Sequence, residues 1–195
     1  MGTNSAWNSS DDESFIQQYV AGDATAFSEL VQKYQKPIFN LGLRMLGSTP
    51  DAEDVLQETF LRFDQTIRAR KSVHKVGSWL YTVALNLCRK NLRRKYAIRY
   101  ISFGFLGEST DGHNQVPTLI PNAEEDLRAE EMANLIGQLA QKLPVSLREA
   151  LVLRVFQDLA EDETAEILRI SIQTLRVRLT RAKDRLWKAL QDVSG

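Results

Sequence analysis

The chain has 195 residues, of which 43% are hydrophobic, so it holds enough apolar side chains for one large core or two small ones. Its single cysteine excludes an internal disulfide, and no apolar run approaches the roughly 18 residues that suggest a membrane span. The net charge is zero, but residues 65–107 carry ten Lys and Arg without any Asp or Glu, and residues 167–195 carry seven against two, which predicts two separate surfaces for an anionic partner.

The chain is predicted to begin with a polar tail, residues 1–12, followed by two helices. The tail is acidic and lacks the basic and apolar segments of a secretion signal, so we expect a cytoplasmic protein. From residue 13 onward apolar side chains recur at helical spacing as far as Leu46, with Gly22 and Asp23 between the two helices. Pro37 lies inside the second helix, where its missing N–H is expected to cause a kink or a break.

Two further helices complete the first half of the chain. Asp51 is expected to cap a third helix that runs to about Ile67. Residues 68–77 have no helical period and are predicted to form a loop. A fourth helix follows over residues 78–100, with one apolar side and one basic side. The sequence therefore predicts a first helical domain over residues 13–100.

The second half of the chain is predicted to be a linker and a second helical domain. Residues 101–123 concentrate Gly and Pro without a sustained period, which indicates a flexible linker. Helical patterns then cover residues 124–142, 146–156, 161–168 and 172–191. No stretch alternates as a strand does, so the predicted fold class is all-α, with two small helical domains, 13–100 and 124–195.

The last two helical patterns have the form of a helix-turn-helix. The joint Arg169–Ser171 separates them, and Ser171 is placed to cap the longer helix. An isolated Arg-rich helix is equally explained by a solvated basic face, but the short helix and joint before it favour DNA binding in a major groove. The stripe expected to be buried is Leu175, Leu179, Ala182 and Leu186. The candidate DNA-contacting residues are Gln173, Thr174, Arg176, Val177, Arg178, Thr180 and Arg181.

The third helix carries a second candidate binding face. It combines apolar side chains with carboxylates and an amide, which suits a basic partner helix. Acids in a first helical turn also favour the helix macrodipole, so a simple capping role is the alternative. The candidate residues are Asp51, Asp54, Val55, Gln57, Glu58 and Phe60.

Several segments resemble the sigma-70 family of transcription initiation factors. In the C-terminal half these are LP at 143–144, LREALVLR at 147–154, AEIL at 165–168, IS at 170–171 and TLRVRLTRA at 174–182. They closely resemble the family's fourth conserved region, which reads the minus-thirty-five promoter element. Arg169 stands where the family commonly has Gly, and Leu175 where Val is usual. We expect Arg169 to keep a negative φ, so that the helix angle shifts only modestly.

Two N-terminal segments carry the same resemblance. DAEDVLQETFLR at 51–62 is similar to the segment that binds the coiled coil of the polymerase's largest subunit, and WLYTVALNLCRKNLRR at 79–94 resembles the helix that meets the minus-ten element. Capture of a single strand there requires a cationic track and polar groups for an extruded base, and the loop 71–77 is placed where related factors hold a flipped nucleotide. The residues implied are Lys75, Asn86, Arg89, Lys90, Arg93 and Arg94, with Asn86 as the expected base contact, whereas Trp79 is expected in the core.

The resemblance covers residues 13–100 and 124–190, and the short linker leaves no room for the extra domain of larger sigma factors. The chain is therefore identified as a member of the small extracytoplasmic-function group, group 4. This implies a factor that binds core RNA polymerase at the coiled coil and the flap, recognises both promoter elements and assists DNA melting. An anti-sigma factor is a further implied partner, and direct membrane insertion is not expected.

Other classes of function are less well supported by the sequence. A stand-alone helix-turn-helix regulator is the main alternative, and the acidic helix at 51–62 argues against it. A protein that masks another sigma factor would have little use for two basic helices. Cys88, His74 and His113 have no spacing that completes a metal site, and we expect neither a cofactor nor a catalytic centre.

Overall fold

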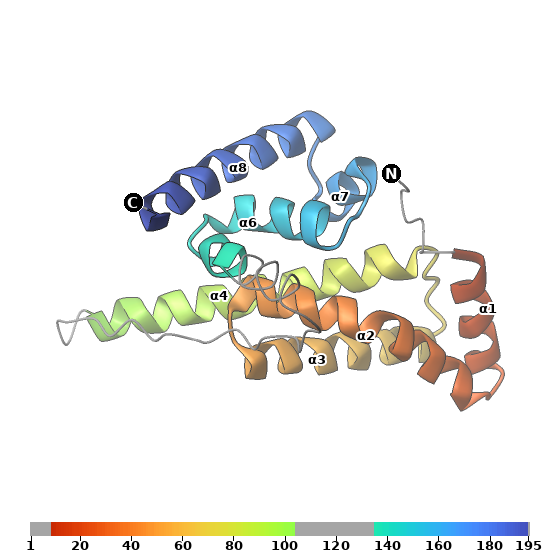
Figure 1. Ribbon diagram of the computed structural model, residues 1–195. Coiled ribbons are helices and arrows are strands. Elements are labelled where there is room, and N and C mark those ends of the chain that lie inside the picture. Colours follow the sequence, from red (N-terminus) through yellow and green to blue (C-terminus); the bar gives the residue numbers. More distant parts are fainter. Residues whose placement is uncertain (1–8, 104–134, 195) are drawn as a thin grey trace, which may run out of the picture.

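The computed structural model describes the backbone of residues 9–103 and 135–194, and the side chains of residues 11–98 and 135–192, as helices and short connections (Figure 1). The N-terminal helices are α1 Ser9–Val20, α2 Ala24–Leu46, α3 Thr49–Arg68 and α4 Val76–Phe103. After a helical segment at residues 135–141 come α6 Val145–Leu151, a π-helical turn Val152–Phe156, α7 Glu161–Leu168 and α8 Ile172–Ser194. The described residues contain no strand, which confirms the all-α prediction. Most of the expected linker, and residues 124–134 of the helix expected after it, lie outside the described residues.

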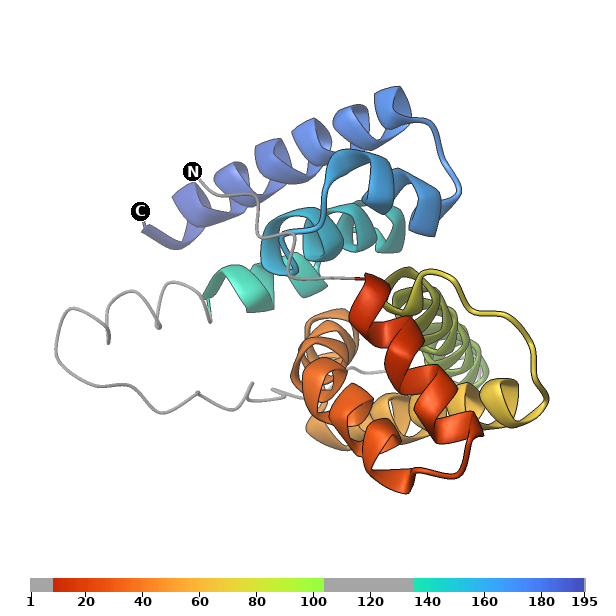
Figure 2. The ribbon, with the colours of Figure 1, turned by 90° about the vertical axis from the view of Figure 1, so that its right-hand side faces the viewer.

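The N-terminal domain forms where α2, α3 and α4 pack their apolar faces together. Leu30, Tyr34 and Ile38 of α2 are fully buried, as is Phe63 of α3. A Cβ on Gly42 would lie 3.1 Å from the Cα of Ala52, so glycine is what lets α2 and α3 approach this closely. Figure 2 looks onto α1, which lies at one end of this domain.

The first helix begins at Ser9, four residues before the apolar spacing indicates. Its first turn is polar, yet the side chain of Asp12 is buried against α2. Asp12 accepts a hydrogen bond from Tyr34 Oη at 2.5 Å and one from Lys33 Nζ at 2.6 Å. A buried carboxylate with two donors is well satisfied, and hydrophobic periodicity does not reveal such a contact.

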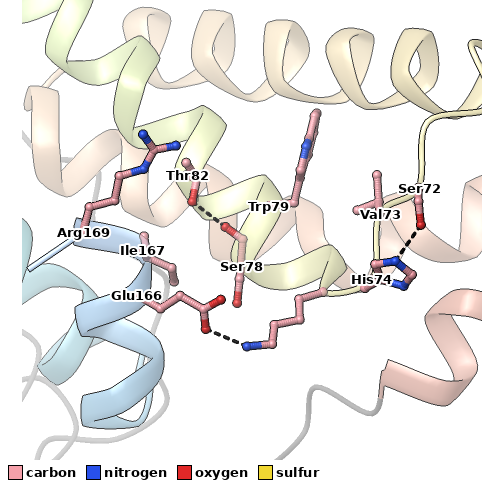
Figure 3. Close-up of a pocket in the computed structure, with 10 residues that line it drawn as sticks. Ser72, Val73, His74, Ser78, Trp79, Thr82, Glu166, Ile167 and Arg169 are labelled. Carbon is pink, nitrogen blue, oxygen red and sulfur yellow. Dashed lines mark hydrogen bonds and ion pairs between the residues drawn. The ribbon is translucent and has the colours of Figure 1, made fainter.

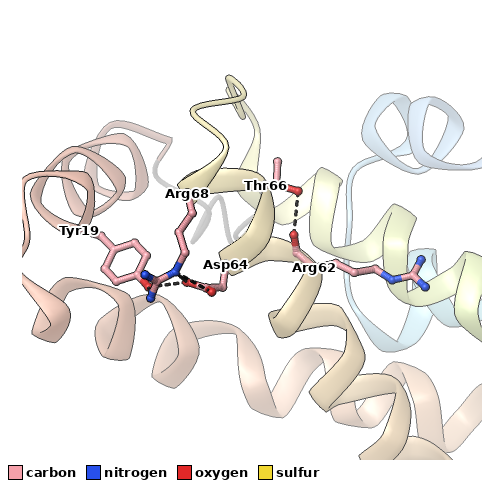
Figure 4. A network of polar contacts seen from close by, with 5 residues as sticks. All are labelled: Tyr19, Arg62, Asp64, Thr66 and Arg68. Carbon is pink, nitrogen blue, oxygen red and sulfur yellow. Dashed lines mark hydrogen bonds and ion pairs between the residues drawn. The ribbon is translucent and has the colours of Figure 1, made fainter.

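A polar network fastens the other end of α1 to α3 (Figure 4). Tyr19 Oη donates to Asp64, and Arg68 Nη2 donates to Tyr19 Oη. Arg68 Nε also lies 2.8 Å from both carboxylate oxygens of Asp64. Because each group both bonds and orients the next, the network fixes the angle of α1 across the domain.

The structure tests two local expectations in the same region. Pro37 does not break α2, which continues from Ala24 to Leu46, because the buried residues on either side of it stabilise the helix more than one lost hydrogen bond weakens it. Asp51 does not cap α3. Ser48 is the cap, and its Oγ accepts from the Asp51 backbone N–H at 3.4 Å.

The C-terminal domain contains the expected helix-turn-helix. The bounds of α7 match the prediction, and Ser171 caps α8 by accepting from the Thr174 N–H at 3.1 Å. Leu175, Ala182 and Leu186 are buried and Leu179 is half-buried, so the predicted stripe is confirmed.

The joint before α8 differs from the expectation. Arg169 has φ 54° and ψ 49°, in the left-handed region, where a negative φ is expected from the sequence. The geometry closes the end of α7, since the N–H groups of Arg169 and Ile170 donate to carbonyls of Glu166 and Ala165. This is the position that glycine favours at a helix end, and a side chain there carries a strain of about 1–2 kcal/mol.

The two domains pack against each other along α2 and α4 (Figure 1). Leu153, Leu159 and Ile167 belong to the same buried apolar cluster as the core of the N-terminal domain. The guanidinium of Arg44 lies 3.9 Å from the centre of the Phe156 ring, and Tyr81 Oη donates to Gln157 at 3.2 Å. No helix among the described residues is both long enough and apolar enough to cross a bilayer.

Candidate nucleic-acid interface

The face of α8 opposite its buried stripe is open to solvent. Arg176 and Arg181 are both exposed on it and lie on either side of its centre, because five residues turn the helix by about 140° beyond one full turn. Six of the seven predicted residues are exposed and Arg178 is half-buried: Gln173, Thr174, Arg176, Val177, Thr180 and Arg181 are the exposed ones. The buried Leu175 and Ala182 hold this face outward.

One residue of this face is held by the short helix before it. Arg176 Nη2 and Nε lie 2.8 and 3.0 Å from the same carboxylate oxygen of Glu161. The hydrogen bond from Arg176 lowers the pKa of Glu161 below its ordinary value. The pair orients the guanidinium across the helix-turn-helix while leaving it accessible.

The basic side of α4 forms a second candidate surface. Asn86, Lys90 and Arg93 are exposed and recur at helical spacing, so their side chains share one face. Arg94 is exposed beside them, whereas Arg89 is half-buried and donates from Nη1 to Asn86 Oδ1 at 3.1 Å. The structure therefore brings together the predicted residues of this helix.

Two of the predicted residues on this side also contact the C-terminal domain. Arg89 Nε and Nη2 donate to the two carboxylate oxygens of Glu149 at 2.6 and 2.9 Å. Lys75 Nζ lies 2.6 Å from Glu166 Oε2, and this bond raises the pKa of Lys75. The acidic partners carry no pattern in the sequence that would mark them, because the contact joins residues far apart along the chain.

A cavity of about 490 Å³ lies at the predicted loop 71–77, between the two domains (Figure 3). His74 and Ser78 line it from the N-terminal side, and Glu166 of α7 and Arg169 of the joint after α7 line it from the C-terminal side. Trp79 also lines it and is half-buried, and its ring centre lies 5.5 Å from that of Phe63, so Trp79 packs against the core that was expected to enclose it.

The acidic face of α3 is only partly as expected. Asp54 and Gln57 are exposed, and Asp51 and Glu58 are half-buried. Asp51 lies 2.5 Å from Lys95 Nζ, and Glu58 lies 2.7 Å from Arg62 Nε. These groups therefore form an accessible polar face.

The apolar residues predicted on the same helix lie elsewhere. Val55 is 2% exposed and Phe60 is 9% exposed, so both side chains belong to the domain core. The exposed apolar side chain is Leu61, which is 52% exposed and was not predicted. Leu61 lies four residues after Gln57 and three after Glu58, and this spacing was the signal that could have identified it.

The chain matches the models of two protein families, Sigma-70 region 2 over residues 30–98 and Sigma-70, region 4 over residues 133–186. It is 33% identical over 181 residues to the ECF RNA polymerase sigma factor SigW of Bacillus subtilis, covering 91% of this chain and 96% of that protein. It is 29% identical over 182 residues to the RNA polymerase sigma-H factor of Pseudomonas aeruginosa, covering 92% of this chain and 94% of the relative.

Solved structures share the fold. The sigma factor RpoE in complex with the anti-sigma factor NepR from Bartonella quintana superposes with a TM-score of 0.64 at 19% identity, over 85% of this chain and 96% of that one. CnrH in complex with the cytosolic domain of CnrY gives a TM-score of 0.61 at 21% identity, over 95% of this chain and 99% of that one.

Proposed function

Because the chain belongs to the extracytoplasmic-function sigma factors of the sigma-70 family, we propose how its surfaces divide the work of a sigma factor. The N-terminal domain binds core RNA polymerase and the minus-ten element, and the C-terminal domain binds the minus-thirty-five element and the polymerase flap. The observation that carries this proposal is the pair of exposed basic faces, on α4 and α8, with a separate acidic face on α3.

The α8 face is assigned to duplex DNA. Arg and Gln side chains near the N-terminal half of a helix reach base edges in a major groove, and further cations neutralise phosphates. Arg181 and Gln173 are exposed and have the chemistry for these contacts. The pair that Arg176 forms with Glu161 orients one guanidinium before DNA arrives, which reduces the entropy lost on binding.

The α4 face is assigned to the opened minus-ten element. Asn86 offers an amide for an extruded base, and Lys90, Arg93 and Arg94 supply a cationic track for the backbone of a single strand. Two weak DNA contacts held on one polymerase act together, since the second contact forms within the complex.

The α3 face is assigned to the coiled coil of the polymerase's largest subunit. Asp54, Gln57 and Glu58 provide polar contacts for a basic helix, and exposed Leu61 provides the apolar contact. We assign Val55 and Phe60 to the packing that holds this face in position.

An anti-sigma factor is a proposed partner, as it is in the solved structures of RpoE with NepR and of CnrH with CnrY. We place the activity in the cytoplasm, where bacterial transcription takes place. The chain contributes binding free energy, and the polymerase carries out the chemistry.

Run-off transcription with purified core polymerase tests the proposal. Transcripts from a dependent promoter should appear when the chain is added and be absent without it. Tight sequence-specific DNA binding by the free chain, with no transcription, would instead favour the stand-alone regulator.

Matched variants test the division of labour. Arg181→Ala should reduce promoter-dependent transcription about fivefold to a hundredfold, because one good bidentate base contact contributes about 1–3 kcal/mol, while polymerase binding stays intact. Asp54→Lys should weaken polymerase binding itself, and transcription with it, by placing a cation against a basic partner. Glu53→Lys, on an exposed neighbour, gauges the general effect of charge on α3. Equal loss of polymerase binding in the Arg181 and Asp54 variants would contradict the assignment.

A further inference from the structure

Glu161 and Arg176 form an ion pair that joins the two helices of the helix-turn-helix. Arg176 is the fifth residue of α8, in the part of the helix from which side chains reach base edges. Glu161 is the first residue of α7. Leu168 of α7 and Leu175 of α8 are buried in one apolar cluster, so both ends of the pair stand on fixed backbone.

The pair occupies some donors of Arg176 and leaves a defined set outside it. A guanidinium carries five N–H donors in a planar fork. One carboxylate oxygen of Glu161 accepts from Arg176 Nη2 at 2.8 Å and from Nε at 3.0 Å. One hydrogen on Nη2 and both on Nη1 remain, so the edge between these two nitrogens still presents two parallel donors. The Arg176 side chain is 62% exposed, so a ligand can approach this edge.

Two parallel donors match one base in the major groove. Guanine presents its O6 and N7 acceptors side by side there, whereas adenine presents one acceptor beside one donor. Thymine offers a single acceptor, and cytosine offers a donor. A guanidinium held by its other edge therefore forms two hydrogen bonds only with guanine.

The carboxylate also opposes binding to DNA of any other sequence. The hydrogen bond from Arg176 lowers the pKa of Glu161, so this side chain is ionised at neutral pH. It is 37% exposed, and its charge offsets the attraction of Arg176 for nearby phosphates. A group that weakens binding except at the right sequence is a general source of specificity.

We propose that Glu161 is a positioning residue that restricts Arg176 to guanine at one base pair of the minus-thirty-five element. This inference rests on the proposed function of the α8 face and adds to it the base that Arg176 reads. Without Glu161, Arg176 turns toward phosphates, so binding to unrelated DNA becomes tighter while the preference for guanine weakens. A residue that only stabilised the fold would weaken both.

Selection of DNA by the holoenzyme measures this preference. Core RNA polymerase carrying the full chain selects duplexes from a random library, and sequencing gives the preference at each base pair. The wild type should prefer guanine at one base pair of the minus-thirty-five element, and Arg176→Ala should abolish that preference and no other. Arg176→Lys, which keeps the charge but lacks the two-donor edge, should abolish it too.

Glu161→Gln keeps the size of the side chain and removes its charge. It should lower the guanine preference at that base pair about fivefold or more, within the range of one bidentate base contact. Binding to a duplex of unrelated sequence should become tighter, and its logarithmic salt slope should steepen by about 0.9, the value for one added phosphate contact. Combined with Arg176→Ala, it should cause no further loss of preference, because the two residues act as a unit.

Two further measurements separate position from charge. Asp162→Asn removes the next carboxylate of the same helical turn, at an exposed residue, and should leave the guanine preference unchanged. A duplex with 7-deazaguanine at the selected position lacks the N7 acceptor. This duplex should bind the wild-type holoenzyme about fivefold or more weakly than guanine does, and Glu161→Ala should reduce that difference.

Three results would overturn the inference. One is that Arg176→Ala abolishes the preference for a base other than guanine. Another is an undiminished guanine preference in both Glu161 variants, and the third is an equal loss of preference at every base pair or in Asp162→Asn. Failure of the proposed function looks different, because the wild-type chain would then enrich no sequence beyond those retained by core polymerase alone.

Discussion

Arg148 makes a buried contact whose loss should be large and measurable. Its side chain is 4% exposed, and its guanidinium donates to three backbone carbonyls: Met45 at 2.6 Å, Leu143 at 3.1 Å, and Gln141. One carbonyl belongs to the end of α2, and the other two belong to the segment before α6. Arg148 therefore closes the C-terminal domain and also fastens it to the N-terminal one.

The cost of Arg148→Met follows from these bonds. A hydrogen bond to a charged group contributes about 1.5–3 kcal/mol, so three would total about 4.5–9 kcal/mol. Burial of the guanidinium opposes this, and it also lowers the pKa of Arg148. We expect the free energy of unfolding to fall by about 3–5 kcal/mol. For a domain of about 60–100 residues, such as the C-terminal one, this lowers the melting temperature by about 12 °C or more.

Thermal unfolding followed by far-ultraviolet circular dichroism measures this loss. Arg148→Lys, which keeps the charge but cannot reach three carbonyls at once, should fall between the wild type and Arg148→Met. A fall of less than about 4 °C for Arg148→Met would refute the reasoning, because it would correspond to only about 1 kcal/mol and would mean that the three carbonyls do not depend on this side chain.

Three further predictions concern single groups. Arg169→Gly should raise the melting temperature by a few degrees. Glycine removes a strain of about 1–2 kcal/mol from the left-handed backbone, whereas the greater loss of chain entropy on folding costs only about 0.5–1 kcal/mol. A fall in the melting temperature would contradict this prediction. Cys88 should react with a thiol reagent only after unfolding, and rapid reaction of the native chain would show that the thiol is accessible. The Glu161 carboxyl should titrate below its ordinary pKa in a carbon-detected NMR titration, and Arg176→Ala should return it toward that value. Because the pKa of Glu161 is lower in the folded than in the unfolded chain, the ion pair with Arg176 stabilises the fold at pH values above the unfolded pKa. This stabilisation is lost as the pH falls through the folded pKa. An unshifted pKa would mean that the ion pair does not form.

Local chemistry was sufficient to predict much of the C-terminal domain. The bounds of α7, the Ser171 cap and the buried stripe of α8 all follow from apolar spacing and capping residues within a few positions of one another. Arg169 shows the limit of this approach. The family pattern of glycine at that position indicates a left-handed turn. The prediction of a negative φ for Arg169 was wrong, because the two flanking helices fix the conformation of the joint whichever residue stands there.

The contact between the domains could not be predicted from local patterns. Tyr81 and Leu85 are fully buried although the spacing of α4 indicates a single apolar side, because the C-terminal domain covers a second side. The partners of Arg89 and Lys75 lie 60 and 91 residues away, so no helical spacing connects them. Asp12 was missed for the same reason, since a polar first turn becomes buried only when α2 is placed beside it.

We propose that a carboxylate-bearing face on α3 attaches this chain to core RNA polymerase while two basic faces remain for DNA. Equilibrium binding of the fluorescently labelled chain to purified core polymerase, without any inhibitor present, tests it most directly. We predict tight, saturable binding of the wild type and of Arg181→Ala, and strongly weakened binding of Asp54→Lys. If the wild-type chain fails to bind the polymerase, the account is contradicted.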